Sequence, residues 1–132
     1  SSIKQELGLL VKKALEDGAN FGRIGLGSIY VFAAGNSGSF NKACVLDPYL
    51  NNIYTFGITS VAENGSFPSY AEECASNLAT TYSGDSYQKE IVTTASDNTC
   101  TSDFSGTSAS ASIAAGIIAL TLEANPRLTW RD

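Results

Sequence analysis

The apolar positions near the N-terminus repeat with helical spacing. Ser2, with Gln5 three residues later, has the form of a capping box. Apolar side chains then recur on one helical face, and Gly18 supplies a stop signal. These apolar residues are Ile3, Leu7, Leu10, Val11, Ala14 and Leu15. The pattern predicts an amphipathic surface helix over residues 3–17.

Two continuous apolar runs follow, at residues 28–34 and 53–59. Short apolar runs bounded by turn residues are typical of strands buried on both faces of a parallel sheet. Residues 78–82 and 91–94 predict two further short strands. Residues 63–66, Glu-Asn-Gly-Ser, predict a turn that could form a hairpin tip.

The longest apolar segment, residues 108–124, predicts a helix that is apolar nearly all round and therefore buried in the core. Asn125-Pro126 ends it, and Thr129 with Asp132 resembles the capping start of another helix. Helices and strands alternate along the chain. The sequence therefore predicts one domain of the α/β class with a mainly parallel sheet.

Composition excludes several functional classes. The 132 residues are 43% hydrophobic and 16% charged, which is typical of a globular chain. The net charge of -5, without a basic cluster, argues against nucleic-acid binding. No apolar run approaches the roughly 20 residues of a membrane span, and no secretory signal pattern opens the chain, so we expect no membrane segment here.

The cysteine count is odd, with Cys44, Cys74 and Cys100. In an oxidised protein this implies one internal bridge and one thiol whose partner lies elsewhere. The absence of histidine and of any Cys-x-x-Cys pair argues against a zinc site. Asn64-Gly65-Ser66 is an N-glycosylation sequon, a tripeptide that also occurs by chance and matters only in the secretory pathway.

The segment Gly106-Thr107-Ser108-Ala109 carries the clearest chemistry. Small residues allow a substrate backbone to approach, and the amides at a helix start favour a developing negative charge on Ser108 or its substrate. The alternative is that Ser108 only caps a core helix. Without histidine these residues cannot build a Ser-His-Asp triad, so either the base lies outside this chain or Ser108 is not a nucleophile. An α/β-hydrolase is excluded, because residue 110 is serine where the nucleophile elbow needs glycine.

Together with Ala33-Ala34-Gly35-Asn36-Ser37-Gly38, this segment resembles the subtilisin-like serine proteases, and most of all their kexin/furin branch, the proprotein convertases. The resemblance continues in family order through residues 27–32, 52–55, 70–74, 91–94, 114–116, 122–126 and 128–132. It implies that residues 1–132 are the C-terminal part of a single catalytic domain whose catalytic aspartate and histidine precede them. The implied fold is three-layered and α/β, with a buried helix that carries the nucleophile and an amphipathic surface helix. The segment alone is expected to be inactive.

The resemblance assigns the catalytic roles. Ser108 would be the nucleophile, and the side-chain amide of Asn36 would donate to the oxyanion, whose charge a preorganised donor stabilises by about 3–4 kcal/mol. Considered alone, Asn36 favours the interpretation of a turn residue that tolerates left-handed backbone angles, and only its pairing with the Ser108 motif favours the oxyanion role.

Substrate binding is also assigned by resemblance. Ala33, Ala34 and Gly35 would lie along the substrate backbone. Asp47 would be a pocket carboxylate that receives an arginine or lysine side chain, since a buried carboxylate binds guanidinium through charge-assisted bonds. The alternative for Asp47 is an ordinary Asp-Pro turn.

A structural calcium ion and the disulfides follow from the same resemblance. Glu72 would be an acidic calcium ligand, but Lys42 stands where the family has another ligand, and a cation there argues against the metal. Cys44 would pair with Cys74, and Cys100 with a cysteine that precedes this chain. These bridges imply an oxidising, secretory compartment of the Golgi, the cell surface or the exterior.

The implied function is a serine endoprotease that forms an acyl-enzyme and processes proproteins after basic residues, with Lys-Arg or Arg-Arg pairs expected. Its partners would be basic-site peptides or proproteins and the upstream half of its own catalytic domain. The alternative is a noncatalytic homologue, either a pseudoprotease or a truncated product, that binds peptides or partners. The departures Lys42 and Ser112, the latter in place of the family's proline, favour this alternative; retention of both Ser108 and Asn36 favours the protease.

Overall fold

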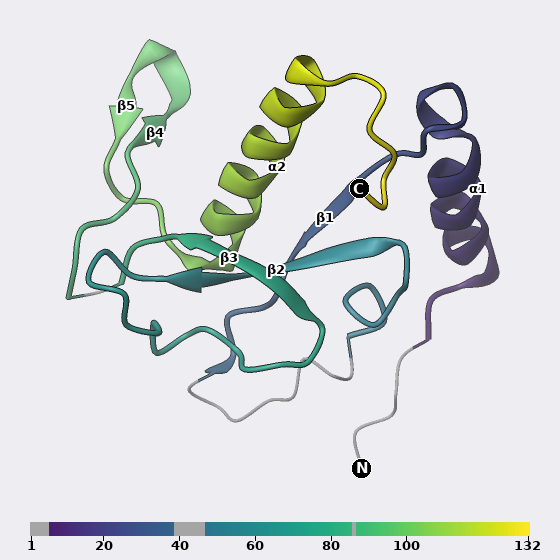
Figure 1. Ribbon diagram of the computed structural model, residues 1–132. Helices are drawn as coiled ribbons and strands as arrows, with labels where there is room; N and C mark the ends of the chain where they lie inside the picture. The colour runs from purple at the N-terminus through teal and green to yellow at the C-terminus, as the bar shows by residue number, and fades with distance from the viewer. Residues whose placement is uncertain (1–5, 39–46, 86) are drawn as a thin grey trace.

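The computed structural model describes residues 6–38, 47–85 and 87–132. Strands β1 (Tyr30–Ala33), β2 (Thr55–Val61) and β3 (Asn77–Tyr82) form a parallel sheet in the order β1-β2-β3. Helix α2 (Gly106–Ala124) packs against all three strands (Figure 1). The α/β class and the parallel sheet are therefore confirmed.

The strands differ from the prediction in burial and partners. β2 lies between its two neighbours and is largely buried, as expected. β1 is only half-buried along its length, because it pairs on one side alone within the described residues. The turn at residues 63–66 is present, but it connects the parallel strands β2 and β3, so the hairpin was wrong.

Residues 91–94 do not add a strand to the sheet. Only β4 (Thr93–Thr94) forms there, and it pairs antiparallel with β5 (Cys100–Thr101). The short 3-10 helix η3 (Ser96–Asn98) joins them. This small ribbon stands apart from the main sheet in Figure 1.

Helix α1 (Leu9–Gly25) begins and ends later than predicted. Gly18 does not stop the helix. It provides room for Tyr30, since a Cβ on Gly18 would lie 1.7 Å from the Tyr30 hydroxyl. The regular helix is instead interrupted at Gly22, where the backbone leaves helical angles through Ile24.

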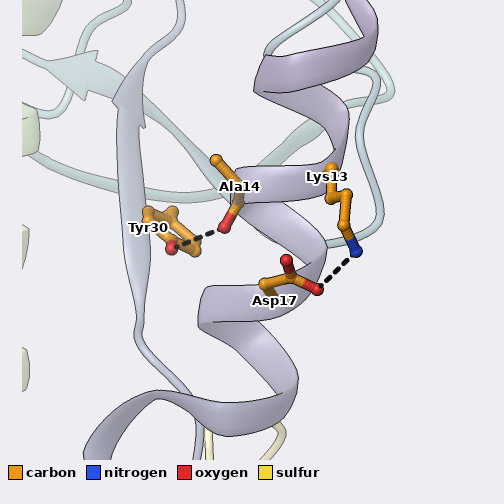
Figure 2. A network of polar contacts seen from close by, with 4 residues as sticks. All are labelled: Lys13, Ala14, Asp17 and Tyr30. Carbon is orange, nitrogen blue, oxygen red and sulfur yellow. Dashed lines mark hydrogen bonds and ion pairs between the residues drawn. The ribbon is translucent and has the colours of Figure 1, made fainter.

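Tyr30 fastens α1 to the start of β1. Its hydroxyl donates to the Ala14 carbonyl oxygen at 3.4 Å, beside the Lys13–Asp17 ion pair of 3.2 Å (Figure 2). The buried face of α1 is narrower than the sequence predicted. Leu15 and Ala19 are buried, whereas Leu10 is 83% exposed.

Helix α2 is buried along only half of its length. Its buried residues, Gly106, Thr107, Ala109, Ser110 and Ala114, all belong to the half nearer the sheet. Ile117 and Leu120 are 54% and 66% exposed, so within the described residues the predicted burial of this helix holds for its first half and not for its second.

By length and composition alone, α2 could also cross a membrane, which the sequence pattern did not suggest. It is the one helix of the described residues that meets both criteria. A core helix meets them too, and the first half of α2 packs against the sheet.

The C-terminal residues form the predicted capping bonds without a helix. The Thr129 amide donates to Asp132 Oδ2 at 2.7 Å, and the Arg131 amide donates to Thr129 Oγ1 at 3.2 Å. The bond from the Thr129 backbone amide lowers the pKa of Asp132. Residues 130 and 131 form a turn.

Candidate active site

The side chain of Asn36 joins the end of β1 to the start of α2. Asn36 follows β1 closely, and its Oδ1 accepts two hydrogen bonds from Thr107, one from the backbone amide and one from the hydroxyl, both at 2.9 Å. Both bonds use the amide oxygen. The orientation of the side chain is therefore set, and its Nδ2 hydrogens remain for another acceptor.

Asn36 also acts as the cap of α2. The N-cap residue Ser105 makes no side-chain cap bond, so Asn36 Oδ1 supplies the acceptor that the first turn needs. Ser108 lies inside this first turn with an exposed side chain. The interpretation of Ser108 as a mere cap was therefore wrong.

Thr107 is the centre of this arrangement and was not predicted to have a role. It is fully buried, and while its hydroxyl donates to Asn36, the oxygen accepts the Gly35 amide at 3.1 Å. Thr107 thus connects the residues on both sides of the peptide bond between Gly35 and Asn36. Its position directly before Ser108 ties the nucleophile candidate to the oxyanion-donor candidate.

Two glycines are required by this geometry. Gly106 has φ +84°, and a Cβ there would lie 2.9 Å from Asn36 Nδ2. Gly35 has φ +104°, and a Cβ there would lie 2.5 Å from Glu72 Oε1. Left-handed backbone angles and close packing both exclude a side chain at these positions.

Glu72 supports the same turn from the other side. Its carboxylate is buried, and Oε1 accepts the Ser37 amide at 2.9 Å. Its backbone carbonyl accepts from Asn77 Nδ2 at 2.8 Å, which fixes Glu72 to the start of β3. Glu72 thus touches the residues that flank Asn36.

The assignment of Glu72 as a calcium ligand stays a prediction. One carboxylate oxygen already accepts a backbone amide, and no group of three or more acidic, cysteine or histidine residues gathers within the described ranges. Calcium takes six to eight oxygen ligands, usually with several carboxylates. Lys42 lies outside the described residues.

A buried hydroxyl network holds the first half of α2 against the sheet. Ser110 Oγ lies 2.8 Å from Ser60 Oγ in β2, and Ser110 exchanges bonds with β3 through Thr81. Ser83 Oγ donates to the Gly106 carbonyl at 2.9 Å. The hydroxyl residues on this helix were visible in the sequence, but their partners were not, because β2 and β3 are distant along the chain.

The proposed substrate-backbone residues continue directly from β1. The Ala34 amide donates to the Ile58 carbonyl at 2.9 Å, which extends the pairing with β2, and Ala34 is 1% exposed. Ala33 ends β1, and Gly35 contacts Thr107 as described above. All three therefore lead into the Asn36 turn.

Asp47 forms the Asp-Pro turn that was its alternative interpretation. Its Oδ1 accepts the amides of Tyr49 and Leu50 at 2.8 and 3.3 Å, and the residue is exposed. Tyr49 stacks on Phe32 of β1 with ring centroids 5.1 Å apart, so the turn is fastened beside that strand. A role in substrate binding has to use the second carboxylate oxygen.

The cysteines are tested only in part. Cys74 is disulfide-bonded. Cys44, its predicted partner, lies outside the described residues, so the pairing stays a prediction. Cys100 is an exposed free thiol, and its predicted partner is not in this chain.

A hollow of about 350 Å³ lies on a different set of residues from those predicted for the site. It is lined by Glu63, Tyr82, Ser83, Lys89, Glu90 and Ile91. A hydrogen bond with Asp103 raises the pKa of Glu90, because the two carboxyl groups share a proton more readily than they carry two charges. None of the residues predicted to bind substrate lines this hollow.

Comparison with known proteins agrees with the geometry. The Subtilase family matches residues 2–132. Human proprotein convertase subtilisin/kexin type 5 is 57% identical over 124 residues, which is 93% of this chain and 7% of that protein. Human proprotein convertase subtilisin/kexin type 6 is 56% identical over 126 residues, 95% of this chain and 13% of that protein. Mouse furin is 54% identical over 124 residues, 93% of this chain and 16% of furin.

The chain thus spans between 7% and 16% of the length of these relatives. The match covers nearly all of the chain, including the Asn36 turn and the start of α2. The chain belongs to the subtilase family.

Proposed function

We propose that this chain is part of a serine endoprotease that processes proproteins after basic residues. The observation that carries the proposal is the fixed Asn36 side chain. Its oxygen is held by Thr107, the residue before Ser108, so its Nδ2 is free to donate beside an exposed serine.

In the proposed reaction Ser108 Oγ attacks the carbonyl carbon of the scissile peptide bond. The Ser108 proton passes to a base, and the carbonyl oxygen takes the negative charge. Asn36 Nδ2 donates to this oxyanion. The carbon–nitrogen bond then breaks, the amine leaves with the proton, and water hydrolyses the acyl-enzyme.

The base has to come from outside these residues, because the sequence contains no histidine. We infer that the upstream half of the catalytic domain supplies it, together with the aspartate that orients it. The 132 residues alone are therefore proposed to be inactive.

For specificity we propose Asp47 as the acceptor of a basic side chain. One of its oxygens holds the turn, and the other is left to bind guanidinium or ammonium. Ala33, Ala34 and Gly35 would lie along the substrate backbone beside the Asn36 turn. The proposed preference for a paired basic site rests only on the resemblance to the kexin/furin branch.

We propose a secretory location, the Golgi, the cell surface or the exterior, because of the disulfide at Cys74. Disulfides form in oxidising compartments, and Cys74 is disulfide-bonded.

The test below also measures whether cleavage depends on calcium, since Glu72 alone does not make a calcium site among the described residues.

The test uses the longest natural product that contains this chain. Its cleavage of a fluorogenic peptide ending in Lys-Arg is measured with and without calcium, beside Ser108→Ala. We expect cleavage by the native protein and a loss of about 10⁴-fold or more in kcat for Ser108→Ala.

Other outcomes decide among the alternatives. Cleavage that does not depend on calcium would support the protease function and contradict the expected calcium requirement. A folded, fully processed sample that neither cleaves nor reacts with a fluorophosphonate probe would favour the noncatalytic peptide-binding homologue, for which Lys42 and Ser112 are the sequence arguments.

A further inference from the structure

We propose that Asn64 carries an N-linked oligosaccharide, an inference that rests on the secretory location proposed above. Asn64-Gly65-Ser66 is the single Asn-x-Ser/Thr tripeptide in the sequence. It lies in the turn after β2, and all three of its residues are exposed. The candidate acceptor asparagine therefore lies in a surface turn, where a folded domain has room for a bulky, hydrated glycan.

The turn has a defined backbone with open space around it. The Ala62 amide donates to the Ser66 carbonyl and the Gly65 amide to the Ala62 carbonyl, both at 2.9 Å. Gly65 has φ +82°, and a Cβ there would meet nothing within 4 Å. The space beside the central residue of the tripeptide is therefore open.

The hydrogen bonds of Asn64 are compatible with the modification. Its Oδ1 accepts the Ser66 amide at 2.8 Å, which forms an Asx turn. The modified atom is Nδ2, and the side-chain carbonyl remains an acceptor after an N-glycosidic bond has formed. The turn can therefore keep its geometry with the glycan in place.

The contacts that fasten the turn to the rest of the molecule also avoid Nδ2. Gln88 accepts the Asn64 backbone amide at 3.4 Å and donates to Ser66 Oγ at 3.3 Å. Lys89 pairs with Glu63 at 3.1 Å. Modification of the Asn64 amide nitrogen breaks none of these contacts.

The transfer requires a lipid-diphosphate-linked oligosaccharide as its co-substrate. Asn64 Nδ2 attacks the anomeric carbon of the first sugar, and a carbon–nitrogen bond forms. The bond from that carbon to the diphosphate oxygen breaks, and the lipid diphosphate leaves with the electron pair. The nitrogen loses one proton to the transferring enzyme, which reads the Ser66 hydroxyl of the sequon.

The test maps the modification on the longest natural product that contains this chain, secreted from eukaryotic cells. The protein is treated with peptide N-glycosidase in heavy-oxygen water, and the peptide containing residue 64 is analysed by mass spectrometry. We expect Asn64 to be converted to aspartate with one heavy oxygen incorporated. Native protein suffices for this measurement, so it does not depend on how a variant folds.

Matched variants separate the sequon from the turn. Ser66→Ala should lose the glycan and Ser66→Thr should keep it. Gln88→Ala removes the two Gln88 hydrogen bonds to the turn and leaves the tripeptide intact, so it should also keep the glycan.

Peptide cleavage by the same samples separates this inference from the proposed function. If the secreted protein cleaves the peptide but its residue-64 peptide is unmodified, the proposed glycosylation is wrong and the proposed protease function stands. A glycan on Asn64 in a secreted protein that does not cleave supports the glycan and counts against the protease. A natural protein retained in the cytosol overturns the secretory location and the glycan together.

Discussion

Asn36 and Asn64 occupy related positions and have very different surroundings. Each follows closely on a parallel strand, β1 for Asn36 and β2 for Asn64, so both lie at the same edge of the sheet. Each has an exposed side chain whose Oδ1 accepts a backbone amide and whose Nδ2 makes no bond to the protein among the described residues. Exposure and side-chain bonding alone do not distinguish them.

The difference lies in where the partners come from. The partner of Asn64 is Ser66, inside its own turn, whereas the partner of Asn36 is Thr107, 71 residues away in the sequence. Gly35 and Ser37, beside Asn36, are also held by Thr107 and Glu72. A local turn presents an amide nitrogen to solvent. A turn held by distant elements aims that nitrogen at a fixed point, as stabilisation of an oxyanion requires.

The largest expected effect comes from removing the Asn36 side-chain amide, the proposed oxyanion donor. Asn36→Ala should lower kcat of the full-length protease by about 10²–10³-fold with little change in KM, a magnitude established in subtilisin, a member of this family. Steady-state kinetics on the basic peptide measure it. A loss confined to KM would mean that Asn36 binds substrate and does not stabilise the oxyanion.

The next largest effect is expected from a variant that keeps the Asn36 side-chain amide but removes one of the hydrogen bonds that fix its orientation. Thr107→Val removes the hydroxyl bond to Asn36 Oδ1 and leaves the Gly35 amide without its acceptor. At about 1 kcal/mol for such a bond, kcat should fall roughly fivefold. Thr107→Ser, which keeps the hydroxyl, is the control. Equal losses in both variants would show that the methyl packing of Thr107 matters and the hydroxyl does not.

A smaller effect is expected from the support on the other side of the turn. Glu72→Leu leaves the Ser37 amide unpaired, whereas Glu72→Gln keeps an acceptor there. The leucine variant should lose about 1–3 kcal/mol of stability and several-fold in kcat, and the glutamine variant much less. Denaturant unfolding and kinetics are measured for both.

Two further measurements show how Glu72 acts. If it acts through Asn36, Glu72→Leu should have little additional effect on kcat in an Asn36→Ala background, because coupled residues are not additive. A glutamine variant whose calcium dependence differs from that of the native protein would show instead that Glu72 binds the metal.

The smallest effect is expected at the other asparagine. Asn64→Gln should leave kcat and KM unchanged and change stability by about 0.5 kcal/mol or less, as for most surface substitutions. Kinetics and thermal unfolding of unglycosylated samples measure it. A loss of kcat close to that of Asn36→Ala would mean that the two turns are coupled and that the comparison does not hold.

Short-range patterns predicted much of the fold. The runs at residues 28–34, 53–59 and 78–82 correspond to the three sheet strands, and α2 was placed to within two residues at its start. These features depend on neighbours in the sequence, as does the capping bond between Thr129 and Asp132. Errors occurred where a distant residue decided the outcome. Gly18 lies within α1, and the side chain that it lacks leaves room for the distant Tyr30.

The candidate site follows the same division. The sequence motif singled out Ser108, and the resemblance to the kexin/furin branch singled out Asn36. The absence of histidine left two interpretations, a base outside this chain or a serine that is not a nucleophile. Which atom of Asn36 is held, the support from Thr107 and Glu72, and the exposure of the second half of α2 were decided only by the tertiary structure. The physical reason is that a side-chain hydrogen bond depends on the position of its partner, and these partners are far apart along the chain until the strands and α2 pack together.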